Sequence, residues 1–194
     1  MAARRVLLFG ASGFLGQQVF AALSRDPRAG TIVRVGRQVT DTGWVGHDLV
    51  HDTGQQLAEL LRSVEPDTVI NCAGRLTGST TDLVEANVLV TARLLDAVAA
   101  GAPAARLVVI GSAAEYGVVP VGRPVGEDDP TDPVGIYGIT RLAGTQLVRL
   151  AVDQGSADAV ALRVFNPIGP GLPVENLLGR AADSMRTAIE QGHD

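Results

Sequence analysis

The feature that most constrains this chain is a run of three glycines, Gly10, Gly13 and Gly16, spaced three residues apart. The segment before them, 6–9, is apolar at every position, as expected of a strand buried on both faces of a parallel sheet. In the segment after them, 17–23, apolar residues recur with a helical period. A buried strand, a glycine turn and a helix in this order are typical of a dinucleotide site. The sequence therefore predicts nucleotide binding at this turn.

Each glycine of the turn has a separate expected task. Gly10 permits the tight turn, Gly13 lets the backbone approach a pyrophosphate, and Gly16 lets the helix pack close to the strand. The N–H groups at the start of the helix then face the phosphate charge. The cofactor contacts expected in this segment are Gly10, Ser12, Gly13, Phe14, Leu15 and Gly16.

A second apolar run, 31–35, predicts the next strand, which ends at Gly36 and Arg37. Dinucleotide folds that bind NAD place a carboxylate near this point, where it accepts a hydrogen bond from the ribose 2′-hydroxyl. Here the guanidinium of Arg37 could instead pair with a 2′-phosphate. The sequence therefore favours NADP as the cofactor, with NAD as the second possibility. The alternative interpretation of Arg37 is an ordinary surface arginine at the end of a strand.

The rest of the chain alternates apolar strands with amphipathic helices. His47-Asp48-Leu49 is expected to end a short third strand, and further strands are expected at 67–71, 107–110 and 160–165. Helices are expected at 55–64, 82–100, 137–154 and 177–191, with a loop at 120–133. This order predicts a single domain over 1–194, built as a doubly wound parallel sheet with helices on both faces.

Composition excludes several classes of function. The net charge of −5 and the 4% of aromatic residues argue against a nucleic-acid partner, which needs basic and base-stacking surfaces. Cys72 is the single cysteine, which excludes an internal disulfide and a cysteine-rich zinc site, and no metal site is expected. No apolar stretch approaches the length of a membrane span or a signal peptide. We therefore expect a cytoplasmic protein without a membrane partner.

Three polar residues follow the strand at 107–110 and could carry out chemistry. Ser112 lies just past the end of that strand, where open α/β sheets place their ligands. Tyr137 begins a helix, and Arg141 lies four residues later on the same helix face. A nearby cation stabilises a phenolate, so Tyr137 could give or take a proton while Ser112 hydrogen-bonds the substrate oxygen. With a nicotinamide beside them, these residues would support hydride transfer.

These motifs together resemble the extended short-chain dehydrogenases/reductases, also known as the NAD-dependent epimerase/dehydratase family of nucleotide-sugar enzymes. The matching segments are 10–16, 48–49, 71–74, Asn87, Ser112 with 116–117, 137–141 and 162–171. They span nearly the whole chain in the family's order. The resemblance implies a Rossmann-type fold and chemistry on a nucleotide-linked sugar.

The resemblance also implies roles for individual residues. Ser112, Tyr137 and Arg141 would be catalytic, and Asp48 and Leu49 would lie by the adenine. The other implied cofactor contacts are Cys72, Ala73, Gly74, Asn87, Tyr137, Arg141 and Phe165. The implied substrate contacts are Ser112, Ala113, Tyr137 and Asn166.

The sequence departs from the family in two places. Arg141 stands where the family has lysine, and arginine is bulkier, planar and unable to lose its proton. Family members also continue for about a hundred residues into a small domain over the sugar, and this chain stops where that domain should begin. The substrate domain is therefore expected to be largely absent, whether the chain is a short form, a fragment or one piece of a split protein.

The residues after Ser112 narrow the expected reaction. Ala113 and Ala114 replace the acid and base of the sugar 4,6-dehydratases, and Ala114 replaces the cysteine of GDP-fucose synthase. Glu115 is displaced and is not expected to substitute for them. The reactions that remain as expectations are carbonyl reduction and 4-epimerisation of a nucleotide-linked sugar.

Two further questions stay open at this point. The alternative function is a catalytically weak dinucleotide-binding sensor, scaffold or subunit of a split enzyme. The helices at 82–100 and 137–154 could pair with a second copy to form a homodimer, or could pack on their own sheet.

Overall fold

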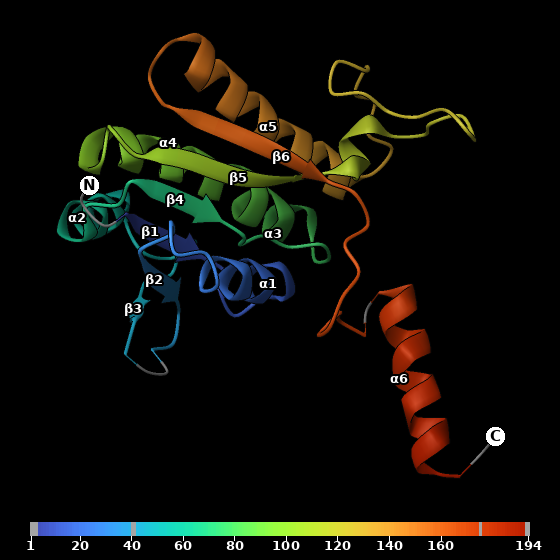
Figure 1. The fold of residues 1–194 in the computed structure, drawn as a ribbon. Helices are drawn as coiled ribbons and strands as arrows, with labels where there is room; N and C mark the ends of the chain where they lie inside the picture. The colour runs from blue at the N-terminus through green and yellow to red at the C-terminus, as the bar shows by residue number, and fades with distance from the viewer. Residues whose placement is uncertain (1–3, 40–41, 175, 193–194) are drawn as a thin grey trace.

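The computed structural model describes residues 4–39, 42–174 and 176–192, and it places a parallel sheet at the centre of the molecule (Figure 1). The strands are β1 Arg5–Phe9, β2 Thr31–Gly36, β3 Trp44–Gly46, β4 Thr68–Asn71, β5 Arg106–Ser112 and β6 Ala159–Val164. Their order across the sheet is β3-β2-β1-β4-β5-β6, and each neighbouring pair is parallel. The order reverses between β1 and β4, as in a doubly wound sheet, so this prediction is confirmed.

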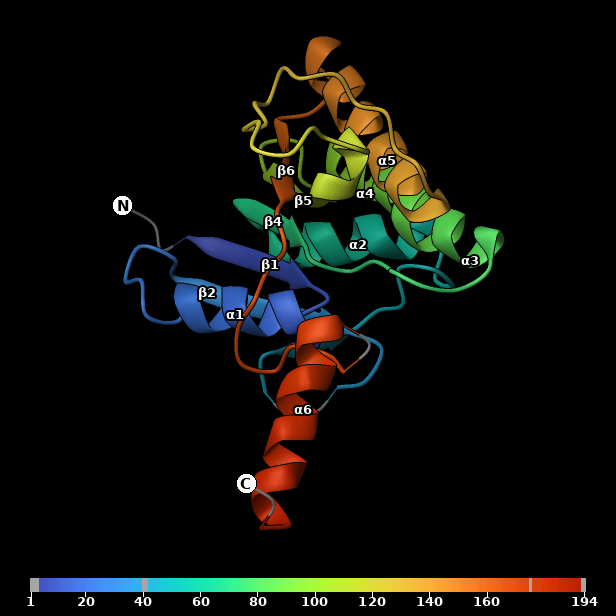
Figure 2. The same cartoon turned by 90° about the vertical axis from the view of Figure 1, so that its right-hand side faces the viewer.

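The helices of the described residues alternate with the strands, except that β3 follows β2 without a helix between them. The helices are α1 Phe14–Leu23, α2 Gly54–Val64, α3 Thr80–Val84, α4 Val90–Gly101, α5 Ile136–Asp153 and α6 Leu177–Glu190. A π-helical segment, Glu85–Leu89, joins α3 to α4, and a 3₁₀ turn, Ala113–Tyr116, follows β5. Helices α2, α4 and α5 cover one face of the sheet and α1 covers the other, while α6 extends away from the sheet (Figures 1 and 2).

Local sequence explains where these elements begin and end. Two helices begin with a capping box. In α2 it is formed by Thr53 and Gln56, and in α3 by Ser79 and Asp82. Helix α2 ends at Val64, and its C-cap residue Glu65 has a φ of +47° and precedes Pro66. The apolar run 6–9 is buried at every position, as its composition predicts.

The core explains why β1 lies in the middle of the sheet. Leu7 and Phe9 of β1, Val69 of β4 and Leu107 of β5 are buried against α2 and α4, where Leu94 is also buried. A strand between two strands and two helix layers exposes no face to water, which requires an unbroken apolar run.

Several predicted boundaries were wrong. The strand predicted at 107–110 runs from Arg106 to Ser112, because its ladder with β6 continues to Ser112, so Ser112 is the last residue of this strand rather than a residue just past it. The third strand ends at Gly46, before His47, because its ladder with β2 stops where Gly36 pairs with Gly46. The last strand ends at Val164, where its ladder with β5 stops at Ser112, so Phe165 lies past it. The helix predicted at 82–100 begins two residues earlier, after the Ser79 cap, and contains the π-helical segment.

Candidate active site

The glycine turn brings α1 against the end of β1. Gly10 has a φ of +69°, and a Cβ at this position would lie 2.5 Å from the backbone nitrogen of Ala73. Gly16 is buried in the first turns of α1, and a Cβ there would collide with the carbonyl oxygen of Gly10 and lie 2.8 Å from the Cα of Ala11. Side chains are therefore excluded at both positions by backbone atoms, as the dinucleotide motif predicts.

A cleft of about 520 Å³ opens at the carboxyl edge of the sheet, beyond the ends of β1, β2 and β4. The predicted cofactor residues that line it are Gly10, Ser12, Gly13, Arg37, Asp48, Leu49, Cys72, Ala73 and Gly74. The other predicted cofactor residues, Phe14, Leu15, Gly16, Asn87, Tyr137, Arg141 and Phe165, lie outside this lining. The structure thus gathers four separate segments of the sequence at one cleft with the size and place of a dinucleotide site.

At one end of the cleft lies Arg37, the residue predicted to distinguish NADP from NAD at the adenosine ribose. Strand β2 ends at Gly36, and a Cβ there would lie 2.8 Å from the ring of Trp44. A carboxylate at position 36 would therefore require Trp44 to move. The next side chain, Arg37, lines the cleft and supplies a cation at this point.

Asp48 is held as a carboxylate in the wall of the cleft. Its Oδ1 accepts hydrogen bonds from the N–H groups of Val50 and His51, and its Oδ2 lies 3.0 Å from Nδ1 of His51. Burial opposes the charged form, but the bonds from His51 and Val50 outweigh it, so the pKa of Asp48 lies below its usual value. Asp48 can therefore accept hydrogen bonds from a ligand as well as from its own loop.

His47 lies in the wall of the cleft, with 8% of its surface exposed. Its Nδ1 is 3.1 Å from Oδ2 of Asp52, and its ring meets the ring of Phe9 edge to face. Burial lowers the pKa of His47, although the carboxylates of Asp52 and Asp48 act in the opposite direction.

We expect this histidine to make stability fall on acidification. Because the folded protein binds the His47 proton less readily than the unfolded chain, the contribution is present above the unfolded pKa of about 6.5 and is lost as the pH falls. For a single proton, the free energy of unfolding can change by at most about 1.4 kcal/mol per pH unit. Urea unfolding between pH 7.5 and 5.5 measures this slope. A His47→Gln variant should show a flatter dependence, and an equal slope in both proteins would contradict the assignment.

Cys72 lies in the same wall but lacks the character of a nucleophile. Burial raises the pKa of its thiol to about 11, so it remains protonated at neutral pH. It supplies a small side chain at the exit of β4 in the lining of the cleft, and the close approach of a flat ligand there stays a prediction.

Ser112 stands at the end of β5 with its hydroxyl oriented by the following turn. Its Oγ accepts a hydrogen bond from the N–H of Ala114 at 3.2 Å, and its own N–H donates to Oε1 of Glu115 at 2.8 Å. Accepting from Ala114 uses a lone pair of the oxygen, so the hydroxyl hydrogen can be donated to a substrate oxygen.

The first turn of α5 packs directly on the turn that follows Ser112. A Cβ at Gly138 would lie 2.6 Å from the carbonyl oxygen of Ala114, so glycine lets these two segments meet. Tyr137 is the neighbouring residue, half-buried at the start of α5. The structure thus brings the segments of Ser112 and Tyr137 together.

Arg141 connects this corner to the cleft at the carboxyl edge of the sheet. Its Cζ lies 5.4 Å from the centre of the Tyr137 ring, and its Nη1 donates to the carbonyl of Ile110 at 3.1 Å. The guanidinium also packs on Gly74, where a Cβ would lie 2.9 Å from Cζ. Within the described residues its buried Nε has no hydrogen-bond partner. Arg141 therefore spans from Tyr137 to the exit of β4, which lines the cleft.

Asn87 is buried in the π-helical segment, and its amide is used by the protein itself. Oδ1 accepts from the N–H of Arg75, and Nδ2 donates to the carbonyl of Arg75 and to Oγ1 of Thr140. These bonds use both amide hydrogens and hold the exit of β4 against α5. π-helical segments are frequent at functional sites. A direct cofactor contact by Asn87 stays a prediction.

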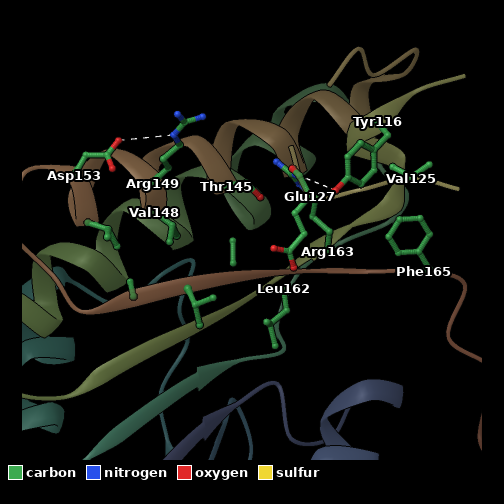
Figure 3. A pocket seen from close by; sticks show the side chains of 14 residues that line it. Tyr116, Val125, Glu127, Thr145, Val148, Arg149, Asp153, Leu162, Arg163 and Phe165 are labelled. Carbon is green, nitrogen blue, oxygen red and sulfur yellow. Dashed lines mark hydrogen bonds and ion pairs between the residues drawn. The ribbon is translucent and has the colours of Figure 1, made fainter. Parts of the chain in front are cut away.

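Phe165 and Asn166 follow the end of β6 and lie outside the lining of the cleft. The Phe165 ring is 5.8 Å from that of Tyr116, and both line a second hollow of about 480 Å³ beside β6 (Figure 3). Asn166 follows at a φ of +36° and is exposed. Their predicted contacts with cofactor and substrate stay predictions.

The comparison with protein families matches residues 6–194 to the NAD-dependent epimerase/dehydratase family. The chain belongs to this family. A curated relative, the dTDP-6-deoxy-L-talose 4-dehydrogenase (NAD(P)(+)) of Kitasatospora kifunensis, is 38% identical over 191 residues, which cover 97% of this chain and 60% of the relative.

Solved structures show the same fold. The UDP-glucuronic acid 4-epimerase of Bacillus cereus, in complex with NAD, aligns with a TM-score of 0.81 at 22% identity, covering 94% of this chain and 63% of that one. MoeE5, in complex with UDP-glucose and NAD, aligns with a TM-score of 0.75 at 30% identity, covering 91% and 59%. The chain therefore spans about three fifths of the length of these relatives.

For this epimerase/dehydratase family member, the sequence analysis missed several ionisable residues at the site. His47, His51, Arg75, Asp82 and Glu85 line the cleft. His47, His51 and Arg75 flank the motifs at 48–49 and 71–74, which was the available signal. None of the helices in the described ranges is long and apolar enough to cross a membrane. The cytoplasmic location stays a prediction.

Proposed function

We propose that this chain contains the cofactor-binding and catalytic residues of an NAD(P)-dependent enzyme that reduces or epimerises a nucleotide-linked sugar at C4. One observation carries the proposal: α5 packs on the Ser112 turn at Gly138, while Arg141 extends from Tyr137 to Gly74 of the cleft. The similarity to a 4-dehydrogenase and a 4-epimerase supports chemistry at C4 of a nucleotide-linked sugar.

The residues of the cleft fit a dinucleotide. Backbone atoms exclude any side chain at Gly10 and Gly16, and a Cβ at Gly13 would meet only the carbonyl oxygen of Gly10, at 3.3 Å. The Gly13 side of the turn is thus open for a pyrophosphate. Arg37, Asp48 and the small residues at 72–74 would hold the rest of the molecule. When bound, the nicotinamide supplies or accepts a hydride at the carbon that reacts.

The protein's own residues would control the proton. In reduction the Tyr137 hydroxyl donates a proton to the C4 oxygen as the carbonyl becomes an alcohol, and in oxidation it takes that proton back. The Ser112 hydroxyl donates a hydrogen bond to the same oxygen and stabilises the charge that develops there. Arg141 contributes a fixed positive charge beside the Tyr137 ring.

We also propose that the cofactor site prefers NADP. Arg37 supports this preference as a cation in the cleft, and a carboxylate at position 36 would require the Trp44 ring to move. The relatives include proteins bound to NAD and one named for NAD(P), so binding to this chain has to be measured.

An Arg37→Ala variant should bind NADPH about 10- to 100-fold more weakly. The reason is that it loses one charge-assisted hydrogen bond, which contributes about 1.5–3 kcal/mol. Affinity for NADH should stay within about threefold, because NADH lacks the 2′-phosphate. Calorimetric titration of both cofactors measures these changes. The control is Arg62→Ala, which removes an exposed arginine of α2 outside the cleft. Equal losses for the two cofactors would contradict the 2′-phosphate role.

The second candidate function is a catalytically weak dinucleotide-binding sensor, scaffold or subunit. Arg141 favours this alternative, because it replaces the family's lysine and its Nε is buried without a partner among the described residues. Turnover of NADPH with a panel of nucleotide-linked 4-ketosugars separates the two. If both the wild type and an Arg141→Lys variant bind NADPH but turn over no substrate, the alternative is correct.

A homodimer through α4 and α5 is part of the proposal. The support is that Leu89, at the end of the π-helical segment before α4, and Ile139 and Leu150 on one face of α5 are exposed apolar residues. Exposed apolar residues of this kind fit contact with a second copy. Light scattering of the purified protein reports the mass directly.

A further inference from the structure

A completely buried carboxylate lies behind Ser112. Glu115 has 0% of its surface exposed, and its Oε1 accepts the N–H of Ser112. Its Oε2 accepts from Nε of Arg163 at 2.9 Å, which joins the turn after β5 to strand β6. A Cβ at Gly111 would lie 2.6 Å from Oε1, so the backbone is shaped to admit this carboxylate.

Arg163 also binds the turn and the loop that follow Ser112. Its Nη1 donates to the hydroxyl of Tyr116 at 2.9 Å and to the carbonyl of Glu127 at 3.0 Å. Its guanidinium stacks on the Tyr116 ring at 4.8 Å. Figure 3 shows Arg163, Tyr116 and Glu127 side by side in the hollow beside β6. One guanidinium therefore holds three separate groups.

The loop fixed in this way leads from Ser112 to Tyr137. It begins at Gly117, which has a φ of +73° and would place a Cβ 2.7 Å from the carbonyl carbon of Asp132. The start and the end of the loop are thus packed together, and Arg163 fixes its middle at Glu127. Arg163 therefore contacts both the turn after Ser112 and the middle of the loop that leads to Tyr137.

We propose that Glu115 and Arg163 are positioning residues that fix Ser112 for the reaction proposed above, on which this inference rests. Buried ion pairs are often no more stable than apolar residues of similar volume, so stability alone does not explain one here. An apolar pair would fill the same space but would leave the Ser112 N–H without its acceptor. What the pair adds is a fixed backbone at Ser112 and therefore a fixed direction for the Ser112 hydroxyl.

Three variants test the proposal. Arg163→Met removes the cation, Glu115→Gln keeps an acceptor for Ser112 without the charge, and Glu115→Leu/Arg163→Met makes the site apolar. The matched control is Arg106→Met, which breaks the exposed ion pair with Asp158 at the opposite end of the same two strands. The readouts are amide hydrogen exchange by NMR, kcat and KM with a 4-ketosugar nucleotide, NADPH affinity and Tm.

In Arg163→Met we expect the rate of hydrogen exchange at the Ser112 amide to rise by about tenfold or more, because a hydrogen bond to a charged group is lost. The exchange rate at the Val109 amide in β5 should stay unchanged. We expect kcat to fall by about tenfold or more and KM and NADPH affinity to stay within about threefold, since a misplaced hydroxyl slows the chemical step. Glu115→Gln should lie between this variant and the wild type. Arg106→Met should match the wild type.

The double variant separates positioning from stability. It should recover the Tm that Arg163→Met loses, because no buried charge is left unpaired, but it should not recover kcat. Recovery of both, or an unchanged Ser112 exchange rate in Arg163→Met, would overturn the proposal. If the wild type binds NADPH without turning over a substrate, the proposed function is overturned instead. Amide hydrogen exchange at Ser112 would then be the measurement that tests whether Glu115 and Arg163 hold this residue.

Discussion

A Tyr137→Phe variant should lose turnover by about 10²- to 10⁴-fold, the usual contribution of a positioned general acid or base. The substitution removes only the hydroxyl. The ring that packs 5.4 Å from the Arg141 guanidinium remains, so the fold and the cofactor cleft should stay intact. NADPH consumption with a nucleotide-linked 4-ketosugar measures kcat, and a titration measures cofactor affinity, which we expect to change by less than about threefold.

The chain contains a second tyrosine that serves as the matched control. Tyr116 is buried, and its hydroxyl accepts a hydrogen bond from Arg163 rather than lying at the start of α5. Tyr116→Phe removes the same atom and should reduce kcat by no more than about tenfold, the value of one hydrogen bond to a charged group. If the two variants lost turnover equally, Tyr137 would have no special part in proton transfer.

Much of the fold could be predicted because its signals are local. The unbroken apolar run at 6–9 indicates a strand with neighbours on both sides, and β1 is buried between β2 and β4. The glycines at 10, 13 and 16 predict a turn where side chains have no room, and backbone atoms fill that room at Gly10 and Gly16. Most residues predicted to bind the cofactor by these short motifs line a single cleft.

What could not be predicted depends on partners that are distant in the sequence. Asn87 is bonded to Arg75 and to Thr140, and nothing near Asn87 indicates either partner. Glu115 lies 48 residues from Arg163, so the sequence shows a displaced carboxylate where the structure has a buried ion pair. Tertiary pairing of this kind also sets the end of β3, which stops where β2 stops.

A Gly16→Ala variant should lose both stability and cofactor binding. The added Cβ meets the carbonyl group of Gly10 and the Cα of Ala11, which are backbone atoms and cannot turn away. Helix α1 must then move off the end of β1, at a cost of about 1–3 kcal/mol for overpacking, or roughly 2–10 °C in Tm for a chain of this size. Because the N–H groups that face the pyrophosphate move with the helix, NADPH affinity should fall by about 100-fold or more.

Gly13→Ala separates these two effects within the same turn. A Cβ at Gly13 would lie 3.3 Å from the carbonyl oxygen of Gly10, and its φ of −77° suits alanine, so unfolding free energy should stay within about 1 kcal/mol of the wild type. The methyl group would nevertheless occupy the side of the turn where the pyrophosphate approaches, so affinity should fall as far as in Gly16→Ala. Thermal unfolding with and without NADPH measures both quantities. If Gly13→Ala bound NADPH as the wild type does, the pyrophosphate would not lie on the turn, and the cleft would have to hold its ligand in another way.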